Sequence, residues 1–523
     1  MTKRISSAVR SSKLRRLAFL ALGLAGASGL MAAKAPDKPV IMTAEQDHQN
    51  MMDQLGIKKL RPGVQNDVKA KENPVNYDEK KANPWPNYPD PLVMENGEKV
   101  TTANQWWNRR RPELIGMFER EIYGRIPASA PKVTWSVQTV DREFLGFTPI
   151  VATKLIAHAD NSAYPAIKLD FPMMLIKPAQ AKGPMPLLIM FTFGGLNFPA
   201  PAQPSPEEFA KINQDWKAMM IAKDPSLEAV FEAHPAWQPF NAPPFAIPPL
   251  DKYGDPPPLY QFIADGWAVA MIEPNSIQAD GGAGLTQGVI GLSNKGQPRK
   301  PEDWGVLRAW AWGASRALDY LETDPDIDAK HVGIEGVSRY GKAALVAMAF
   351  DQRFGMALVA SSGESGTKPH RRNYGETVEN QAATAAYHWM AGNFLKYAAE
   401  DSKFGAKNAG DIPIDAGELI ALCAPRLTFI SYGSPAGGDP PWVDQHGGFM
   451  ATVQAGKVFR LLGAKDLGVG DDYSHAKMPP VNKGLLDGQL AWRQHDGGHT
   501  DGPNFKYFIQ WADKMIGRES PSQ

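Results

Sequence analysis

Short apolar runs bounded by turn residues recur along the chain from about residue 101 onward, for example at 186–191 and 267–272. Such runs are typical of strands buried on both faces of a parallel sheet. Between them, segments such as 303–321 repeat apolar residues at the spacing of one helix face. This alternation predicts an α/β fold, a three-layer sandwich around a doubly wound, mostly parallel sheet. Further strands are expected at 331–334, 356–360, 427–432 and 490–492, and further helices at 449–462 and 504–515.

Composition divides the chain after its first 35 residues into two parts. Residues 36–100 are rich in Pro, Asn, Asp and Lys, and we expect them to wrap around or link to a domain. Residues 101–519 carry the alternating pattern and are expected to form that domain. A proline-rich insertion at about 197–259 interrupts the pattern and contains a helical piece at 206–222. Such insertions commonly form the rim of a binding site, with an unstructured decoration as the alternative.

The first 35 residues resemble an export signal. Basic residues precede an apolar stretch at 17–30, and Ala33-Lys34-Ala35 follows as a small-x-small cleavage site. The stretch is too short to span a membrane comfortably, which disfavours a membrane anchor. Arg15-Arg16 would suit a twin-arginine route, but the pair also occurs in ordinary signals, so the Sec route is favoured. We expect a soluble periplasmic or secreted protein.

The charge balance and the single cysteine exclude several classes of protein. The 56 Lys and Arg residues equal the 56 Asp and Glu residues in number, so no nucleic-acid footprint or strongly acidic partner is implied. One cysteine, Cys423, stands in an apolar context, which rules out an intrachain disulfide and favours a buried structural thiol.

Ser338 lies at a predicted sharp turn between a strand and a helix, in the sequence 334–342, Ile-Glu-Gly-Val-Ser-Arg-Tyr-Gly-Lys. A serine at such a turn holds its hydroxyl out of the sheet, beside backbone N–H groups, as in the nucleophile elbow of α/β-hydrolases. The usual Gly-x-Ser-x-Gly is altered, because Tyr340 takes the second position after the serine and Gly341 the third. Arg339 follows the serine directly. We therefore expect 101–519 to be an α/β-hydrolase catalytic domain.

A nucleophilic serine needs a base, a carboxylate that orients the base, and donors for the oxyanion. His499 follows the last predicted strand in a Gly-Gly-His turn, and we prefer it to His495 because two glycines let the backbone swing toward the serine. Asp439 and Glu364 each follow a predicted strand, and we expect them to share the orienting role. Other histidines, which line the cleft or serve in polar packing, are His370, His388 and His446.

The segment 193–195, Phe-Gly-Gly, is similar to the His-Gly-Gly loop that supplies oxyanion donors in other esterases. A plain turn is the alternative reading of these three residues. If the segment acts as that loop, its backbone N–H groups would add to the donors at the elbow.

Taken together, these motifs resemble the glucuronoyl esterases, carbohydrate esterase family fifteen. The family elbow reads Gly-Cys-Ser-Arg-x-Gly-Lys, and residues 336–342 match it except for Val337 in place of cysteine. The family's Glu-Ser-Gly is similar to 364–366, its Asp-x-Trp loop to 439–444 with one extra residue, and its Gly-x-His turn to 497–499. The likeness covers roughly 106–517.

The resemblance implies particular roles for residues around the serine. Arg339 would stabilise the oxyanion, and Lys342 would donate to sugar hydroxyls. Trp442 would cover the sugar ring. Glu379 and Glu376 are both candidates for the family's sugar-binding glutamate, with Glu379 slightly ahead on its spacing from Glu364. A family glutamine of this region has no secure counterpart here.

The expected function is therefore that of a serine esterase acting through an acyl-enzyme on Ser338. The resemblance implies esters of (4-O-methyl-)glucuronic acid as substrates, as in lignin–glucuronoxylan cross-links. The alternatives are an acetyl xylan or general carboxylesterase, and an inactive carbohydrate-binding protein with a hydrolase fold. We expect no metal, no cofactor, no nucleic-acid partner and no membrane partner after signal cleavage, and a monomer.

Overall fold

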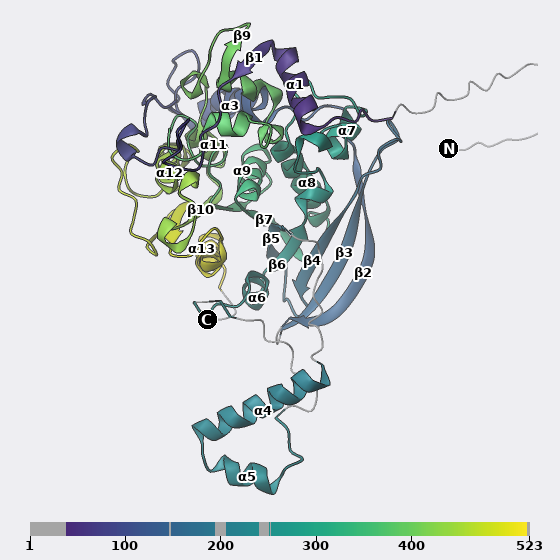
Figure 1. The fold of residues 1–523 in the computed structure, drawn as a ribbon. Helices are drawn as coiled ribbons and strands as arrows, with labels where there is room; N and C mark the ends of the chain where they lie inside the picture. The colour runs from purple at the N-terminus through teal and green to yellow at the C-terminus, as the bar shows by residue number, and fades with distance from the viewer. Residues whose placement is uncertain (1–37, 146–147, 194–204, 240–249, 252, 520–523) are drawn as a thin grey trace, which may run out of the picture. The chain divides into compact units, whose positions relative to one another are not determined.

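The computed structural model describes residues 38–145, 148–193, 205–239, 250–251 and 253–519 (Figure 1). The expected export signal at 1–35 lies outside these residues. Within the described ranges, no helix is both long and apolar enough to cross a membrane.

Within the described residues, a ten-stranded sheet forms the middle of the domain. The neighbouring strands from β12 to β6 are parallel, whereas β11 at one edge and β4, β3 and β2 at the other pair antiparallel. The expected α/β class with a mostly parallel sheet is confirmed. In spatial order the strands are β11 (Gly484–Leu485), β12 (Leu490–His495), β10 (Leu427–Gly433), β8 (Met356–Ala360), β7 (Ile327–Val337), β5 (Met185–Phe191), β6 (Ala268–Ile272), β4 (Asp170–Pro178), β3 (Thr148–Ala159) and β2 (Val133–Leu145).

Helices cover both faces of this sheet. One layer includes α8 and α9, which pack on β7 and on each other, and α12, which packs on β10 and β12; α6 and α13 pack on the sheet and on each other (Figure 1). The helices are α1 (Ala44–Leu55), α2 (Ala103–Gln105), α3 (Arg111–Phe118), α4 (Pro206–Lys223), α5 (Leu227–Ala233), α6 (Pro258–Ala264), α7 (Gly288–Ser293), α8 (Val306–Leu321), α9 (Arg339–Phe350), α10 (Val378–Ala382), α11 (Ala416–Ala421), α12 (Gln445–Leu461) and α13 (Phe505–Ile516).

Alternating side chains of the central strands explain why both layers are needed. Leu187 and Ile189 of β5 belong to the apolar cluster that also contains Trp310 of α8. Leu188, between them, belongs to a separate cluster with Phe508 of α13. Because successive side chains of a strand point to opposite faces, a continuous apolar run requires cover on both sides.

The segment before the domain packs along it rather than standing apart. Thr43 begins α1 with a capping box to Gln46, and β1 (Ile57–Leu60) pairs antiparallel with β9 (Ala399–Ser402). Arg61 then donates to Glu379 at 2.9 Å. The extension is therefore tied by backbone and side-chain hydrogen bonds to residues far along the chain.

The described part of the insertion is helical. Ser205 begins α4 with a capping box to Glu208, which agrees with the helix expected at 206–222. Phe231 of α5 stacks on Trp237, which follows that helix, with ring centroids 5.1 Å apart. Lys217 of α4 lies 5.8 Å from the Trp237 ring, so an aromatic and cationic contact joins the two helices.

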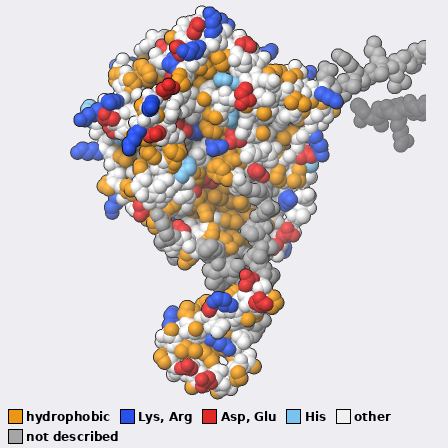
Figure 2. Space-filling view, viewed as in Figure 1, with side chains coloured by type: hydrophobic (Ala, Val, Ile, Leu, Met, Phe, Trp, Pro, Cys, Tyr) orange, Lys and Arg blue, Asp and Glu red, His pale blue; other side chains and the backbone are white. Residues whose placement is uncertain are grey.

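Charged side chains of both signs are interspersed on the face seen in Figure 2, and neither sign dominates there. Some of the charges form ion-pair networks that join helices. Arg353, just after α9, pairs with Asp351 at 2.7 Å and with Asp319 of α8 at 2.8 Å. This network joins the C-terminal ends of α8 and α9, at the opposite end of α9 from Ser338.

Candidate active site

Ser338 occupies the turn between β7 and α9, with φ 59° and ψ −126°. A non-glycine residue in this conformation is strained, and such strain is concentrated at functional sites. The Ser338 N–H donates to the Ala360 carbonyl at 2.9 Å, which fixes the turn to the end of β8. The backbone therefore has the geometry of a nucleophile elbow.

Two glycines explain the altered elbow motif. A Cβ on Gly336 would collide with the Tyr340 carbonyl, and one on Gly341 would lie 2.7 Å from the Ala360 carbonyl oxygen. Tyr340 is buried and contacts Trp310, with ring centroids 5.1 Å apart. The glycine is thus needed at the third position after Ser338, where α9 crosses β8, while the second position holds a core aromatic.

His499 and Asp439 meet at the carboxyl ends of β12 and β10. His499 Nδ1 lies 2.6 Å from Asp439 Oδ1. The other oxygen of Asp439 accepts from Ser361 Oγ at 2.8 Å and from the Gly433 N–H at 3.0 Å. Asp439 is fully buried, whereas the His499 side chain is 31% exposed. With Nδ1–H donating to the carboxylate, Nε2 is left as the basic nitrogen.

His495, the competing base, has both ring nitrogens engaged by the backbone. Its Nε2 lies 2.8 Å from the Thr500 carbonyl, and its Nδ1 accepts from the Gly497 N–H at 3.0 Å. Burial lowers the pKa of His495 to about 4. A neutral His495 therefore stabilises the turn that carries His499. Neither of its ring nitrogens is left to accept a proton from Ser338.

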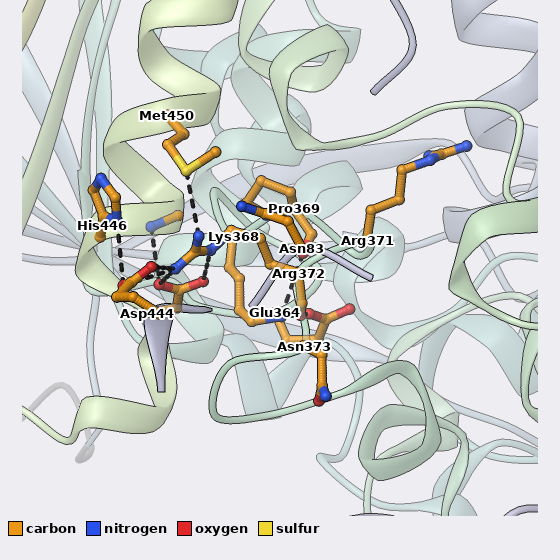
Figure 3. A network of polar contacts seen from close by, with 12 residues as sticks. Asn83, Glu364, Lys368, Pro369, Arg371, Arg372, Asn373, Asp444, His446 and Met450 are labelled. Atoms are coloured by element: carbon orange, nitrogen blue, oxygen red, sulfur yellow. Dashed lines mark hydrogen bonds and ion pairs between the residues drawn. The ribbon is translucent and has the colours of Figure 1, made fainter. Parts of the chain in front are cut away.

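Glu364 has partners other than His499. One of its oxygens lies 2.6 Å from Lys368 Nζ (Figure 3). The other lies 2.5 Å from His370 Nδ1, and the carboxylate is completely buried. Although burial acts to raise it, the Lys368 and His370 charges hold the pKa of Glu364 below its usual range. Asp439 is thus the carboxylate in contact with His499, and the geometry gives no shared orientation by Glu364.

The network around Glu364 reaches into the N-terminal extension. Arg372 binds Asp444 at 2.7 Å and Glu79 of the extension at 3.0 Å (Figure 3 shows the Arg372–Asp444 pair). His446 lies 3.2 Å from the same Glu79 carboxylate. These contacts stabilise the segment on which Asp444 caps α12, so this histidine has a structural partner.

Arg339 begins α9 directly after the serine. Its Nη1 donates to Asp280 Oδ2 at 2.6 Å, and its guanidinium lies 5.4 Å from the ring centroid of Trp389. The side chain remains 42% exposed. Sequence reasoning missed Asp280, because 58 residues separate it from Arg339 and no motif marks it.

Lys342 lies one turn along α9 from Ser338 and is buried. Its Nζ donates to the Ser362 carbonyl at 2.5 Å and lies 5.6 Å from the Trp389 ring centroid. Burial lowers the pKa of Lys342, opposed by the charge of Glu376. Burial raises the pKa of Glu376, opposed chiefly by the charge of Lys342.

Of the two candidate glutamates, Glu376 is the one whose charge interacts with Lys342. The Glu376 N–H donates to the Trp442 carbonyl at 3.2 Å, which sets this glutamate beside the short helix Pro441–Val443. Glu379 pairs with Arg61 of the extension at 2.9 Å. The structure thus pairs the Glu379 side chain with the N-terminal extension, and the choice of Glu379 over Glu376 as the sugar-binding glutamate stays a prediction.

The remaining predicted oxyanion segment is only partly described. Phe193 packs against Tyr340 with ring centroids 4.3 Å apart, while Gly194 and Gly195 lie outside the described residues. Among the residues that the structure describes, no group of three or more His, Cys, Asp or Glu side chains is arranged to hold a metal ion.

Comparisons with known proteins find relatives among the carbohydrate esterases. A family model described as "Glucuronyl esterase, fungi" matches residues 299–463. A carbohydrate esterase, MZ0003, from an unknown prokaryotic organism is 32% identical over 455 residues, which are 86% of this chain and 93% of that protein. The 4-O-methyl-glucuronoyl methylesterase of Schizophyllum commune is 25% identical over 414 residues, 77% of this chain and 80% of that protein.

Solved structures give the same result. A CE15 glucuronoyl esterase from Teredinibacter turnerae is 36% identical to this chain, with a TM-score of 0.73. The match covers 91% of this chain and 100% of that one. A glucuronoyl esterase from Solibacter usitatus is 28% identical, with a TM-score of 0.63, over 83% of this chain and 99% of the other.

Proposed function

The chain belongs to the CE15 glucuronoyl esterases, and on that premise we propose that it hydrolyses esters of (4-O-methyl-)glucuronic acid through an acyl-enzyme on Ser338. The observation that carries the proposal is the buried Asp439 carboxylate on His499, 2.6 Å from Nδ1, combined with the strained elbow at Ser338. Both lie at the carboxyl ends of parallel strands, where serine hydrolases of this fold carry out their chemistry.

Acylation begins when His499 Nε2 accepts the Ser338 proton and Ser338 Oγ attacks the uronate carbonyl carbon. The tetrahedral intermediate carries a negative oxygen, which the Arg339 guanidinium stabilises as a fixed positive donor. The C–O bond to the alcohol then breaks, and His499 returns its proton to the departing alcohol. Water repeats the sequence on the acyl-enzyme and releases glucuronic acid with free Ser338.

Recognition of the sugar is assigned to three side chains around the elbow. Lys342 and Glu376 carry opposite charges that interact within the site, and between them they can donate to and accept from ring hydroxyls. Trp442 offers a flat, partly exposed indole suited to the apolar face of a pyranose. Together they favour a uronate over a small acyl group, and a glucuronoxylan-linked ester, such as a lignin–carbohydrate cross-link, is the natural substrate that we propose.

The substrate assignment is tested by comparing hydrolysis of benzyl glucuronate with that of 4-nitrophenyl acetate. We expect a kcat/KM at least about 10²-fold higher on the uronate, since interactions with several ring hydroxyls are each worth about 1 kcal/mol. Ser338→Ala is the control and should abolish both reactions. Equal rates on the two esters, or a preference for acetylated xylan, would make the chain a general or acetyl esterase instead.

We also propose that the mature protein works in the periplasm or outside the cell. The support is the basic, apolar and small-x-small order of residues 1–35. Cell fractionation should find the processed chain outside the cytoplasm, with its new N-terminus near residue 36. Full-length protein in the cytoplasm would overturn the proposal.

A further inference from the structure

Arg339 needs support if it is to stabilise an oxyanion. Its side chain is long and 42% exposed, and such a chain carries about 2 kcal/mol of rotamer entropy. A donor contributes to catalysis only when it is already directed at the place where charge develops. Some neighbouring group must therefore fix the guanidinium before substrate binds.

Asp280 makes the contacts that such a role requires. It lies in the loop after β6, between the short 3-10 helices Pro274–Ser276 and Gly282–Gly284. One of its oxygens accepts from Arg339 Nη1 at 2.6 Å, and the other accepts from Trp389 Nε1 at 2.6 Å and His388 Nε2 at 2.9 Å. Although burial acts to raise it, these donors hold the pKa of Asp280 well below its usual range.

Trp389 carries the effect of Asp280 to both cations of the site. Its ring centroid lies 5.4 Å from the Arg339 guanidinium carbon and 5.6 Å from Lys342 Nζ. These distances fall within cation–π range. Because the Nε1–H bond to Asp280 holds the indole, the same carboxylate supports Arg339 directly and Lys342 through the ring.

Arg339 keeps unused donors despite this pairing. A guanidinium has five N–H donors, and the contact with Asp280 uses only Nη1. Arg339 Nε is buried without a hydrogen-bond partner among the described residues. A fixed guanidinium with a free, shielded N–H is the arrangement expected of a preorganised oxyanion donor.

We propose that Asp280 is a positioning residue for ester hydrolysis. It fixes the Arg339 guanidinium by direct contact, and by holding the Trp389 indole it supports both Arg339 and Lys342. The inference rests on the oxyanion role assigned to Arg339 under the proposed function. Asp280 touches no reacting atom in this scheme, so its loss should lower kcat only while Arg339 is present.

A double-mutant cycle on benzyl glucuronate tests the proposal. Arg339→Ala should lower kcat by about 10² to 10³. Asp280→Asn, which keeps the size but removes the charge, should lower kcat by about 10- to 100-fold with little change in KM. In the Arg339→Ala background, Asp280→Asn should change kcat less than about 2-fold, since residues that act as a unit are non-additive.

Asp351→Asn is the matched control. Asp351 also binds an arginine, Arg353, at 2.7 Å, and its side chain is 17% exposed, compared with 15% for Asp280. It follows the far end of α9, so its replacement should affect thermal stability without affecting kcat. Asp280→Glu, which restores the charge, should recover part of the activity lost in Asp280→Asn.

Guanidinium ion supplies a readout that a merely structural role would not alter. Added guanidinium should restore part of the kcat of Arg339→Ala, because Asp280 can bind the ion in the vacated place. It should not restore Arg339→Ala/Asp280→Asn. Equal losses from Asp280→Asn in both backgrounds, or equal rescue of both variants, would overturn the proposal.

The two proposals fail in distinguishable ways. If the wild type hydrolyses 4-nitrophenyl acetate but not the uronate, the substrate assignment is wrong, and the same cycle measured on the acetate still decides the role of Asp280. If Arg339→Ala leaves kcat unchanged on both esters, Arg339 is no oxyanion donor and the inference about Asp280 fails with it. Should Asp280→Asn fail to fold, Trp389→Phe, which removes the indole N–H that binds Asp280, would take its place in the cycle.

Discussion

Replacing Asp439 by asparagine removes one charge from the contact that orients the base. During acylation His499 becomes an imidazolium, with its charge centre about 4 Å from that of the carboxylate. At an effective dielectric constant of about 20, the lost attraction is about 4 kcal/mol, or about 10³-fold in rate. The asparagine amide would also disturb the Nδ1–H tautomer, and we expect kcat to fall by about 10³ to 10⁴ in total.

Glu364 provides the comparison, because it was the other carboxylate expected from the sequence. Both of its oxygens are bound by Lys368 and His370, so Glu364→Gln should lower the melting temperature by leaving a buried lysine without its counter-charge. Its effect on kcat should stay within about 10-fold, since a buried ion pair outside the reaction does not change the charge on His499.

The assay is steady-state kcat and KM on benzyl glucuronate for both single variants and the double variant, with melting curves for each. The double variant should be about as slow as Asp439→Asn alone. If Glu364→Gln proves as slow as Asp439→Asn, or if the double variant is far slower than either, the two carboxylates share the orienting role and the reasoning from the His499 contact is wrong.

Three further predictions concern Lys342, His495 and Cys423. Lys342→Ala should raise KM for glucuronate esters and leave 4-nitrophenyl acetate nearly unaffected, because ring-hydroxyl contacts change little during acylation; equal losses on both esters would make Lys342 structural. His495 has a pKa of about 4 in place of the usual 6.5, so its neutral form stabilises the fold fully above pH 6.5 and this contribution is lost as the pH falls through 4. In denaturant titrations, wild type should lose about 3 kcal/mol more than His495→Asn between pH 6.5 and 4; matching losses would contradict this. Burial raises the pKa of the Cys423 thiol to about 11, so iodoacetamide at pH 8 should label it only after denaturation, and labelling of the native protein would show that it is exposed.

The elbow and the base could be predicted from the sequence because their signals are local. Glycines at 336 and 341 reflect close backbone approaches within a few residues of Ser338, and His499 follows its strand by only a few positions. The parallel strands were equally visible, since each contains a short apolar segment. Motifs of this kind can be interpreted without knowing which residues pack against them in the folded protein.

Contacts made across the fold could not be predicted in the same way. Asp280 meets Arg339 only because the loop after β6 lies beside the start of α9, and no pattern within the loop reveals that. Glu376 and Glu379 are chemically alike and three residues apart, yet the backbone N–H of Glu376 donates to the Trp442 carbonyl, whereas the Glu379 carboxylate pairs with Arg61. Which of the two glutamates is left for the site depends on where the N-terminal extension with Arg61 packs, and the sequence does not specify that packing.

The antiparallel edge of the sheet was missed for a different reason. No strand was expected between 106 and 185, although β2, β3 and β4 lie there. Most of β2 is exposed, so its side chains lack the continuous apolar run that marks a central strand. An edge strand of this kind is held mainly by its pairing with β3, which is a property of the folded sheet.

Reaction with a fluorophosphonate tests the central claim, that Ser338 is a nucleophile activated by His499 and Asp439. Intact-mass measurement followed by peptide mapping should find one adduct on Ser338 in the wild type. The adduct should form far more slowly in Asp439→Asn than in the wild type. In Asp351→Asn, the control, it should form about as fast as in the wild type. An unmodified Ser338 in protein that still hydrolyses benzyl glucuronate at its full rate, or a single adduct on another serine, would contradict the account.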